Sequence, residues 1–126
     1  MLQAISSSKA PKAIGPYSQA ILANNTLYCS GQIPLDPASG QIVGDTPAQQ
    51  TERVLQNLQA ILQEAGFSFD HVVRCEVYLA DIQDYQEVNQ VYQKYFKGQA
   101  KPARIALEVA KLPKDALVEI SCIAVK

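Results

Sequence analysis

The sequence has little of the residue chemistry that common enzyme sites use. Its 126 residues include one histidine, His71, and no tryptophan. A lone histidine without a Cys-x-x-Cys pair does not make the usual zinc site, so no metal is predicted and His71 is interpreted as a surface or strand-end residue. Glycine-rich phosphate motifs and a serine nucleophile elbow are also absent. Any chemistry must use arginine, glutamate, tyrosine, serine, asparagine, water and backbone groups, without a cofactor.

Long apolar runs and blocks of like charge are missing too. No stretch of about 18 apolar residues is present, which predicts no membrane span, and the first twenty residues lack the apolar core of a signal peptide. The net charge is −1 with no basic block, which makes nucleic acid an unlikely partner. The three cysteines, Cys29, Cys75 and Cys122, are odd in number and lie among strand-like residues, as expected of buried free thiols in a cytoplasmic protein.

Length and composition indicate one folded domain over residues 1–126. Hydrophobic residues make up 48% of the chain and charged residues 18%, the balance of an ordinary globular protein. The hydrophobic pattern predicts six strands, with a hairpin turn at Asn24-Asn25 and a second turn at 112–115. The predicted strands cover residues 2–6, 18–23, 26–30, 71–79, 103–109 and 116–125.

Two helices are predicted between these strands. The first begins after Thr46, which forms a capping box with Gln49 and precedes Pro47, and it ends at Gly66. Its apolar face consists of Val54, Leu55, Leu58, Ile61, Leu62 and Ala65. The second follows Asp81 and ends at Gly98, and its predicted inner side consists of Ile82, Tyr85, Val88, Tyr92, Tyr95 and Phe96.

The last strand is apolar on both faces apart from Glu119 and Ser121, so both faces of the sheet need cover. Two helices can cover only one face of a sheet of this size. We therefore hypothesise that the other face is buried against further copies of the chain in a closed cyclic oligomer.

Two charges interrupt strands that otherwise read as sheet interior. Arg104 offers a planar fork suited to a carboxylate, and Glu119 could position a water or move protons. The alternatives are an ion pair at a strand end for Arg104, and pairing with Arg104 or a lysine for Glu119. Charges in such positions are costly unless they are paired or used, which makes both residues candidates.

Four further positions could line a site. Tyr17 follows Gly15-Pro16 in a loop that can present its hydroxyl, although simple packing is the alternative. Ser30 and Gly31 end a predicted strand, where backbone N–H groups become free. Asn89 lies between valines on the second helix, with a helix-surface amide as its default interpretation.

Several segments together resemble the reactive-intermediate deaminases of the RidA subfamily, and the resemblance covers essentially the whole chain. They are GPYSQA (15–20), YCSGQIPLDPASG (28–40), NLQAILQEAG (57–66), VYLAD (77–81), VNQVYQKYF (88–96) and PARIALEVAKLPKDALVEI (102–120). The resemblance implies a chorismate-mutase-like α+β fold, with two helices on one face of a six-stranded mixed sheet, and a homotrimer whose sheets form a central barrel. It also implies cofactor-independent hydrolysis of 2-imino acids, such as 2-iminobutanoate and 2-iminopropanoate, to 2-oxo acids and ammonia.

The resemblance assigns roles to individual residues. Arg104 matches the substrate-carboxylate arginine, and Glu119 matches the acid that holds the attacking water. Tyr17, Ser30, Gly31 and Asn89 match positions that line an intersubunit pocket.

One departure follows Pro102-Ala103-Arg104. Family members usually carry a small polar residue and a cysteine there, whereas this chain has Ile105 and Ala106. The backbone N–H of Ala106 could still serve the carboxylate. The departure motivates an alternative function, a non-catalytic regulatory protein that binds carboxylate ligands.

Overall fold

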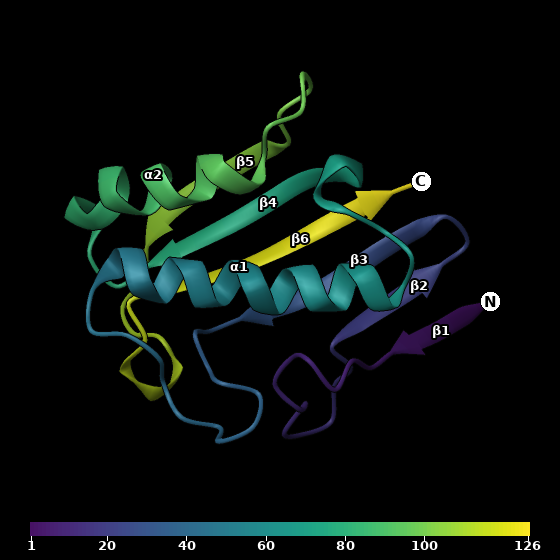
Figure 1. The fold of residues 1–126 in the computed structure, drawn as a ribbon, viewed down its shortest axis with the longest axis horizontal. Helices are drawn as coiled ribbons and strands as arrows, with labels where there is room; N and C mark the ends of the chain where they lie inside the picture. The colour runs from purple at the N-terminus through teal and green to yellow at the C-terminus, as the bar shows by residue number, and fades with distance from the viewer.

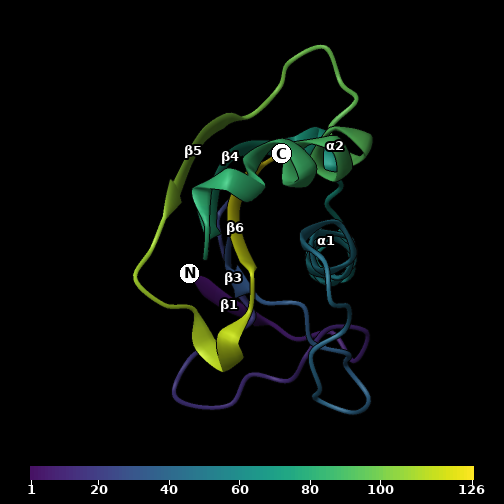
Figure 2. The same cartoon turned by 90° about the vertical axis from the view of Figure 1, so that its left-hand side faces the viewer.

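The fold is one six-stranded sheet with both helices on a single face (Figures 1 and 2). The computed structural model describes residues 1–126. The strand order is β1-β2-β3-β6-β4-β5, and every neighbouring pair is antiparallel except β4 with β5. The strands are β1 (Leu2–Ile5), β2 (Ala20–Ala23), β3 (Thr26–Gln32), β4 (Val72–Leu79), β5 (Ala103–Glu108) and β6 (Val118–Val125). The predicted α+β arrangement, a mixed sheet with two helices, is confirmed.

Helix α1 (Pro47–Glu64) forms as its sequence predicts. The Thr46 hydroxyl accepts from the Gln49 backbone N–H at 3.1 Å, and the Gln49 side chain returns the bond, so the capping box is complete. After the C-cap Ala65, Gly66 takes a φ of +81°, which ends the helix in the left-handed region that favours glycine. The apolar stripe of α1 is fully buried against the sheet at Val54, Leu55, Leu58, Ile61 and Leu62.

Helix α2 (Tyr85–Tyr95) is shorter than predicted and begins differently. Asp81 caps a separate 3₁₀ turn (Ile82–Asp84) through its side chain, and α2 follows directly. Val88, Tyr92 and Phe96 are buried as predicted, but Ile82 and Tyr85 are exposed, so their placement on the inner side was wrong. The helical stripe does not extend back to them because the tighter 3₁₀ turn changes the rotation per residue.

Strand ends differ from the predictions by one or two residues. The segment before β2 is a loop, β3 runs on through Gln32, and β6 starts at Val118 after a 3₁₀ turn at Pro113–Asp115. His71 belongs to a 3₁₀ turn before β4, where its Nδ1 accepts from the Ser68 backbone N–H at 3.0 Å. The Asn24-Asn25 hairpin turn is confirmed, with Asn24 at φ +55°.

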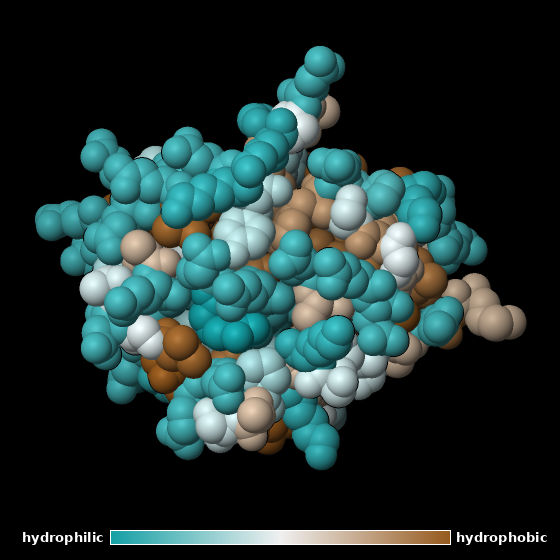
Figure 3. Space-filling view, in the orientation of Figure 1, coloured by the Kyte–Doolittle hydropathy of each residue, from teal (hydrophilic) through white to brown (hydrophobic).

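The two faces of the sheet differ in cover. Along β6 the side chains of Val118, Ile120, Cys122 and Ala124 alternate inward beneath the helices, where they are buried. On the opposite face no helix lies over the sheet (Figure 2), and Tyr28 and Ile105 are 50% and 41% exposed there. The helix-bearing side is mainly hydrophilic on its outer surface (Figure 3). Neither helix is both long enough and apolar enough to cross a membrane.

Candidate functional site

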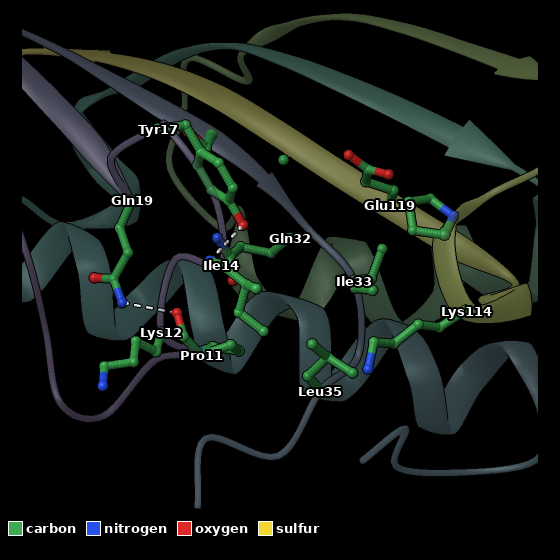
Figure 4. A pocket seen from close by; sticks show the side chains of 13 residues that line it. Pro11, Lys12, Ile14, Tyr17, Gln19, Gln32, Ile33, Leu35, Lys114 and Glu119 are labelled. Atoms are coloured by element: carbon green, nitrogen blue, oxygen red, sulfur yellow. Dashed lines mark hydrogen bonds between the residues drawn. The ribbon is translucent and has the colours of Figure 1, made fainter. Parts of the chain in front are cut away.

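A cavity of about 490 Å³ opens at the end of the sheet where β3 and β6 meet the N-terminal loop (Figure 4). It brings together four of the residues that the sequence singled out: Tyr17, Ser30, Gly31 and Glu119. They come from three separate segments, so the cavity exists only once the hairpin, the loop and the last strand have assembled.

Glu119 is the acidic group of this cavity. It lies on β6 with its side chain on the helix-free face of the sheet, half-buried and without an ionic partner. Burial is what raises the pKa of its carboxyl above the ordinary value of 4.5. A carboxylate that is desolvated but unpaired is suited to accept and return a proton.

A β-bulge in β3 makes room for this carboxylate. Cys29 pairs with Cys122 and Gln32 pairs with Ile120, so β3 advances by three residues where β6 advances by two. The extra residue falls at Ser30-Gly31. A Cβ on Gly31 would collide with Oε2 of Glu119 and lie 3.1 Å from its Cδ. Glycine at this position leaves room for the carboxylate, which an added Cβ would displace, and no unusual φ is involved.

Ser30 is hydrogen-bonded to the loop that precedes β2. Its Oγ donates to the Ser18 carbonyl at 2.6 Å, and its backbone N–H donates to the Gln19 carbonyl at 2.9 Å. The prediction that β3 ends at Ser30-Gly31 with free backbone N–H groups was therefore wrong for Ser30. The strand continues, and the bulge directs the Ser30 backbone N–H to the neighbouring loop.

Tyr17 is displayed on a tight turn. Gly15 has a φ of +131°, and the Tyr17 backbone N–H donates to the Gly15 carbonyl at 2.9 Å. The Tyr17 side chain is 55% exposed, and its hydroxyl is 3.4 Å from the Ile14 backbone nitrogen, from which it accepts a hydrogen bond (Figure 4). Packing within this chain therefore does not account for Tyr17, and its hydroxyl remains accessible at the cavity.

The sequence predictions missed four polar residues that line the cavity, of which Gln32 is buried at the end of β3. Gln19 is buried, and its side chain bonds to Ser7 and to the Pro11 carbonyl, which fixes the N-terminal loop. Lys12 and Lys114 lie at the rim, and Lys114 has a φ of +56°. Hydropathy could not identify a buried glutamine, because its partners are backbone N–H and carbonyl groups of a loop remote in the sequence.

Arg104 forms a second cluster, away from this cavity. Its Nη1 donates to Asn89 Oδ1 at 2.6 Å, and its Nη2 donates to the Tyr85 hydroxyl at 2.7 Å. The guanidinium carbon also lies 4.8 Å from the centre of the Tyr92 ring. Residues 85, 89 and 92 share one face of α2, which therefore supplies every partner of the arginine. Asn89 is thus more than a helix-surface amide.

No carboxylate neutralises Arg104. The one ion pair in the structure joins Lys111 and Asp115, which are exposed. The alternative interpretations, in which Arg104 and Glu119 form an ion pair with each other or with other residues, were therefore wrong. Neutral acceptors and aromatic faces hold the guanidinium in place and leave its charge available to an external anion.

Arg104 and Glu119 lie on opposite faces of the sheet. Arg104 is in register with Cys75 on β4, which is in register with Cys122 on β6, so these three side chains share the helix face. Glu119 is three residues from Cys122, and an odd step along a strand reverses the face. Ala106, two residues after Arg104, is half-buried on the helix side beside Val77. Within one chain the two charged residues cannot act on the same small molecule.

The cysteines form a buried row across the sheet at Cys29, Cys122 and Cys75, and all three are free thiols. The prediction of buried free cysteines is confirmed. Burial raises the pKa of the Cys75 thiol to about 11, which keeps it protonated and unreactive. No group of three or more His, Cys, Asp or Glu side chains is arranged to hold a metal ion.

Comparison with known proteins assigns nearly the whole chain to one protein family. The sequence model described as Endoribonuclease L-PSP matches residues 7–126. The chain belongs to the L-PSP family. A RutC family protein of Pyrococcus abyssi is 52% identical over 124 residues, which cover 98% of this chain and 97% of that protein. The human 2-iminobutanoate/2-iminopropanoate deaminase is 49% identical over 122 residues, which cover 97% of this chain and 88% of that enzyme.

Solved structures of the L-PSP family have the same fold. The Rid-family protein YyfA of Yersinia pestis, described as of unknown function, superposes with a TM-score of 0.97 at 45% identity, and the match covers all of both chains. The resemblance to the RidA deaminases noted from the sequence is thereby confirmed. Human, rat and bovine relatives about 50% identical to this chain carry the imine deaminase name, which supports an enzymatic role.

Proposed function

We propose that this protein hydrolyses 2-imino acids, such as 2-iminobutanoate and 2-iminopropanoate or their enamine tautomers, to 2-oxo acids and ammonia. By removing such reactive imines it would protect other enzymes in the cytoplasm from damage. The observation that carries the proposal is the uncompensated guanidinium of Arg104, preorganised by Asn89 and Tyr85 without an ion pair. Such a group favours a small anionic ligand with a carboxylate.

The reaction needs little beyond positioning and a proton carrier. Arg104 holds the substrate carboxylate and fixes the C=N carbon, and Glu119 orients a water molecule. As the water oxygen adds to that carbon, Glu119 takes one of its protons and the nitrogen receives the electron pair of the π bond. Starting from the protonated imine, this gives an amine, to which Glu119 returns the proton. The C–N bond then breaks with its electron pair on the departing ammonia, and the hydroxyl proton passes to Glu119 as the carbonyl forms. The raised pKa of Glu119 suits this double use.

The active site would lie between copies of the chain in a homotrimer. Arg104, Asn89 and Ala106 would come from one copy, and Tyr17, Ser30, Gly31 and Glu119 from its neighbour. The support is geometric, since the two charged residues occupy opposite faces of their own sheet. A cyclic assembly brings the helix-side edge of one copy to the helix-free face of the next.

Mixed trimers test both the chemistry and the assembly. Arg104→Ala and Glu119→Gln are each expected to lose turnover and to remain trimeric. Equal amounts of the two variants are dissociated and reassembled together. An interface is then native if its Arg104 comes from a Glu119→Gln subunit and its Glu119 comes from an Arg104→Ala subunit. Random assembly makes about one quarter of the interfaces native. The assay generates 2-iminobutanoate with threonine dehydratase and measures competition with semicarbazide trapping.

The outcomes separate the possibilities. Recovery of about a quarter of the wild-type rate supports the shared site, because a site within one chain would stay defective in every mixture. Full activity of either single variant would remove that residue from the mechanism. A wild-type trimer that binds 2-oxobutanoate through Arg104 but does not accelerate hydrolysis would support the regulatory carboxylate-binding function. That alternative was suggested by Ala106, which stands where family members usually carry a cysteine.

The family description also names a ribonuclease, and the same preparations test that activity. A net charge of −1 supplies no broad basic surface for phosphates, so we expect no cleavage of single-stranded RNA. Cleavage that is lost in Arg104→Ala would reassign the function.

A further inference from the structure

We propose that Tyr85 is a positioning residue of the anion site, whose hydroxyl fixes the guanidinium of Arg104 and thereby sets the affinity for carboxylate ligands. The inference deepens the proposed function and rests on it for the nature of the substrate. Neither the sequence pattern nor the family resemblance pointed to Tyr85, which was predicted to lie in the core.

The hydrogen bonds of the guanidinium determine which groups remain for a ligand. Arginine has five N–H groups. Asn89 takes one from Nη1 and Tyr85 takes one from Nη2. Three remain, one on each terminal nitrogen and one on Nε. Because both terminal nitrogens are anchored, the guanidinium plane cannot rotate, and its remaining donors keep one direction.

Tyr85 suits this role because it restrains the cation without neutralising it. Its 2.7 Å bond to Nη2 is close in length to the 2.6 Å bond between Nη1 and Asn89, and its ring centre lies 5.4 Å from the guanidinium carbon. The Asn89 side chain, followed by the positive charge of Arg104, lowers the pKa of the Tyr85 phenol, consistent with a hydroxyl that accepts hydrogen bonds. A carboxylate in the same place would neutralise the arginine and compete with the ligand.

Tyr85 is not part of the hydrophobic core. Its side chain is 38% exposed at the first turn of α2, whereas Tyr92, two turns later, is buried. An exposed tyrosine whose hydroxyl bonds to a functional cation contributes little to folding. Replacement of Tyr85 by phenylalanine therefore removes one hydrogen bond and leaves the fold intact.

The test compares Tyr85→Phe with the matched control Tyr95→Phe on the same helix, using the full-length protein. Calorimetry measures the binding of 2-oxobutanoate and of its neutral analogue 2-oxobutanamide. Tyr85→Phe is expected to bind 2-oxobutanoate about tenfold more weakly, because an oriented hydrogen bond to a charged group is lost. The affinity for the amide, and both affinities of Tyr95→Phe, are expected to stay at the wild-type value. In the deaminase assay KM should rise with kcat within about twofold of wild type.

Wild-type affinity of Tyr85→Phe for 2-oxobutanoate would overturn the inference. A fall in kcat with KM unchanged would also overturn it, since it would move Tyr85 into the chemical step. If the wild-type protein binds 2-oxobutanoate but hydrolyses no imine, the proposed function fails, and the affinity comparison still decides the role of Tyr85. Absence of 2-oxobutanoate binding by the wild type would remove the anion site and the inference with it.

Discussion

At the scale of residues, two charged side chains, Arg104 and Glu119, have no ion-pair partner and so remain available to a ligand. Arg104 is immobilised by an amide, a phenol and aromatic rings rather than by a carboxylate. Glu119 is half-buried with no partner, and burial raises the pKa of its carboxyl. In each case the chain accepts an unpaired charge where an ion pair would be less costly, which is expected where the charge has a ligand to meet.

Tyr92 carries a polar group that the fold does not satisfy. Its hydroxyl is buried and makes no hydrogen bond of ordinary geometry, and burial, followed by the neighbouring Cys75 thiol, raises the pKa of the phenol above its ordinary value of 10.0. We expect Tyr92→Phe to increase the free energy of unfolding by about 1 kcal/mol at neutral pH, measured by urea denaturation. Tyr95→Phe serves as the control.

The pH dependence of Tyr92 has a definite sign. A folded-state pKa above the unfolded value means that the unfolded chain loses its proton first, so stability falls as the pH rises above 10.0. Tyr92→Phe should flatten that alkaline decline. Equal stabilities of the two proteins at neutral pH, and equal alkaline slopes, would show that the hydroxyl is satisfied in solution.

At the scale of elements, the bulge in β3 links a strand irregularity to the site. The extra residue at Ser30-Gly31 increases the local bend and places a residue without a side chain under the Glu119 carboxylate. A regular strand would place a side chain there, and the carboxylate would have to move into solvent.

Gly31→Ala tests this arrangement. We expect a fall in turnover of at least tenfold, about 1.4 kcal/mol in transition-state stabilisation, because the added Cβ displaces Glu119. Gly98→Ala is the matched control, since its Cβ would meet Asp70 Oδ1 at an ordinary 3.5 Å. Both variants should stay folded by circular dichroism. Gly31→Ala with wild-type turnover would place the reactive carboxylate elsewhere.

At the scale of the whole molecule, a single chain leaves the helix-free face of the sheet without cover. Tyr28 and Ile105 are exposed on it, and β6 adds Ile123 and Val125 to the same face. The proposed trimer would bury these side chains and complete the site in one step, so assembly and activity should be lost together.

Ile105→Glu is expected to convert the trimer to monomer, because a charge on the buried face of an assembly costs several kcal/mol. Sedimentation velocity measures the change, and the deaminase assay should show a parallel loss of activity. Val43→Glu, at a similarly exposed apolar residue in the loop before α1, should remain trimeric. A trimeric Ile105→Glu would exclude this face from the interface.

The sequence by itself determined the elements, their order and the identity of the charged candidates. The capping box at Thr46, the turn at Asn24-Asn25 and the alternation along β6 are local signals, written within a few residues of the features they specify. Arg104 and Glu119 stood out because charge within an apolar strand violates the pattern around it.

Only the tertiary structure decided which residues meet. The 3₁₀ turn before α2 moved Tyr85 out of the core and onto Arg104, and strand register put Arg104 and Glu119 on opposite faces. The contact between Tyr85 and Arg104 and the register of the strands join segments that are distant in the chain, so neither is encoded locally. Gln19 was missed for the same reason, since its hydrogen-bond partners are backbone groups of a loop that only folding brings within reach.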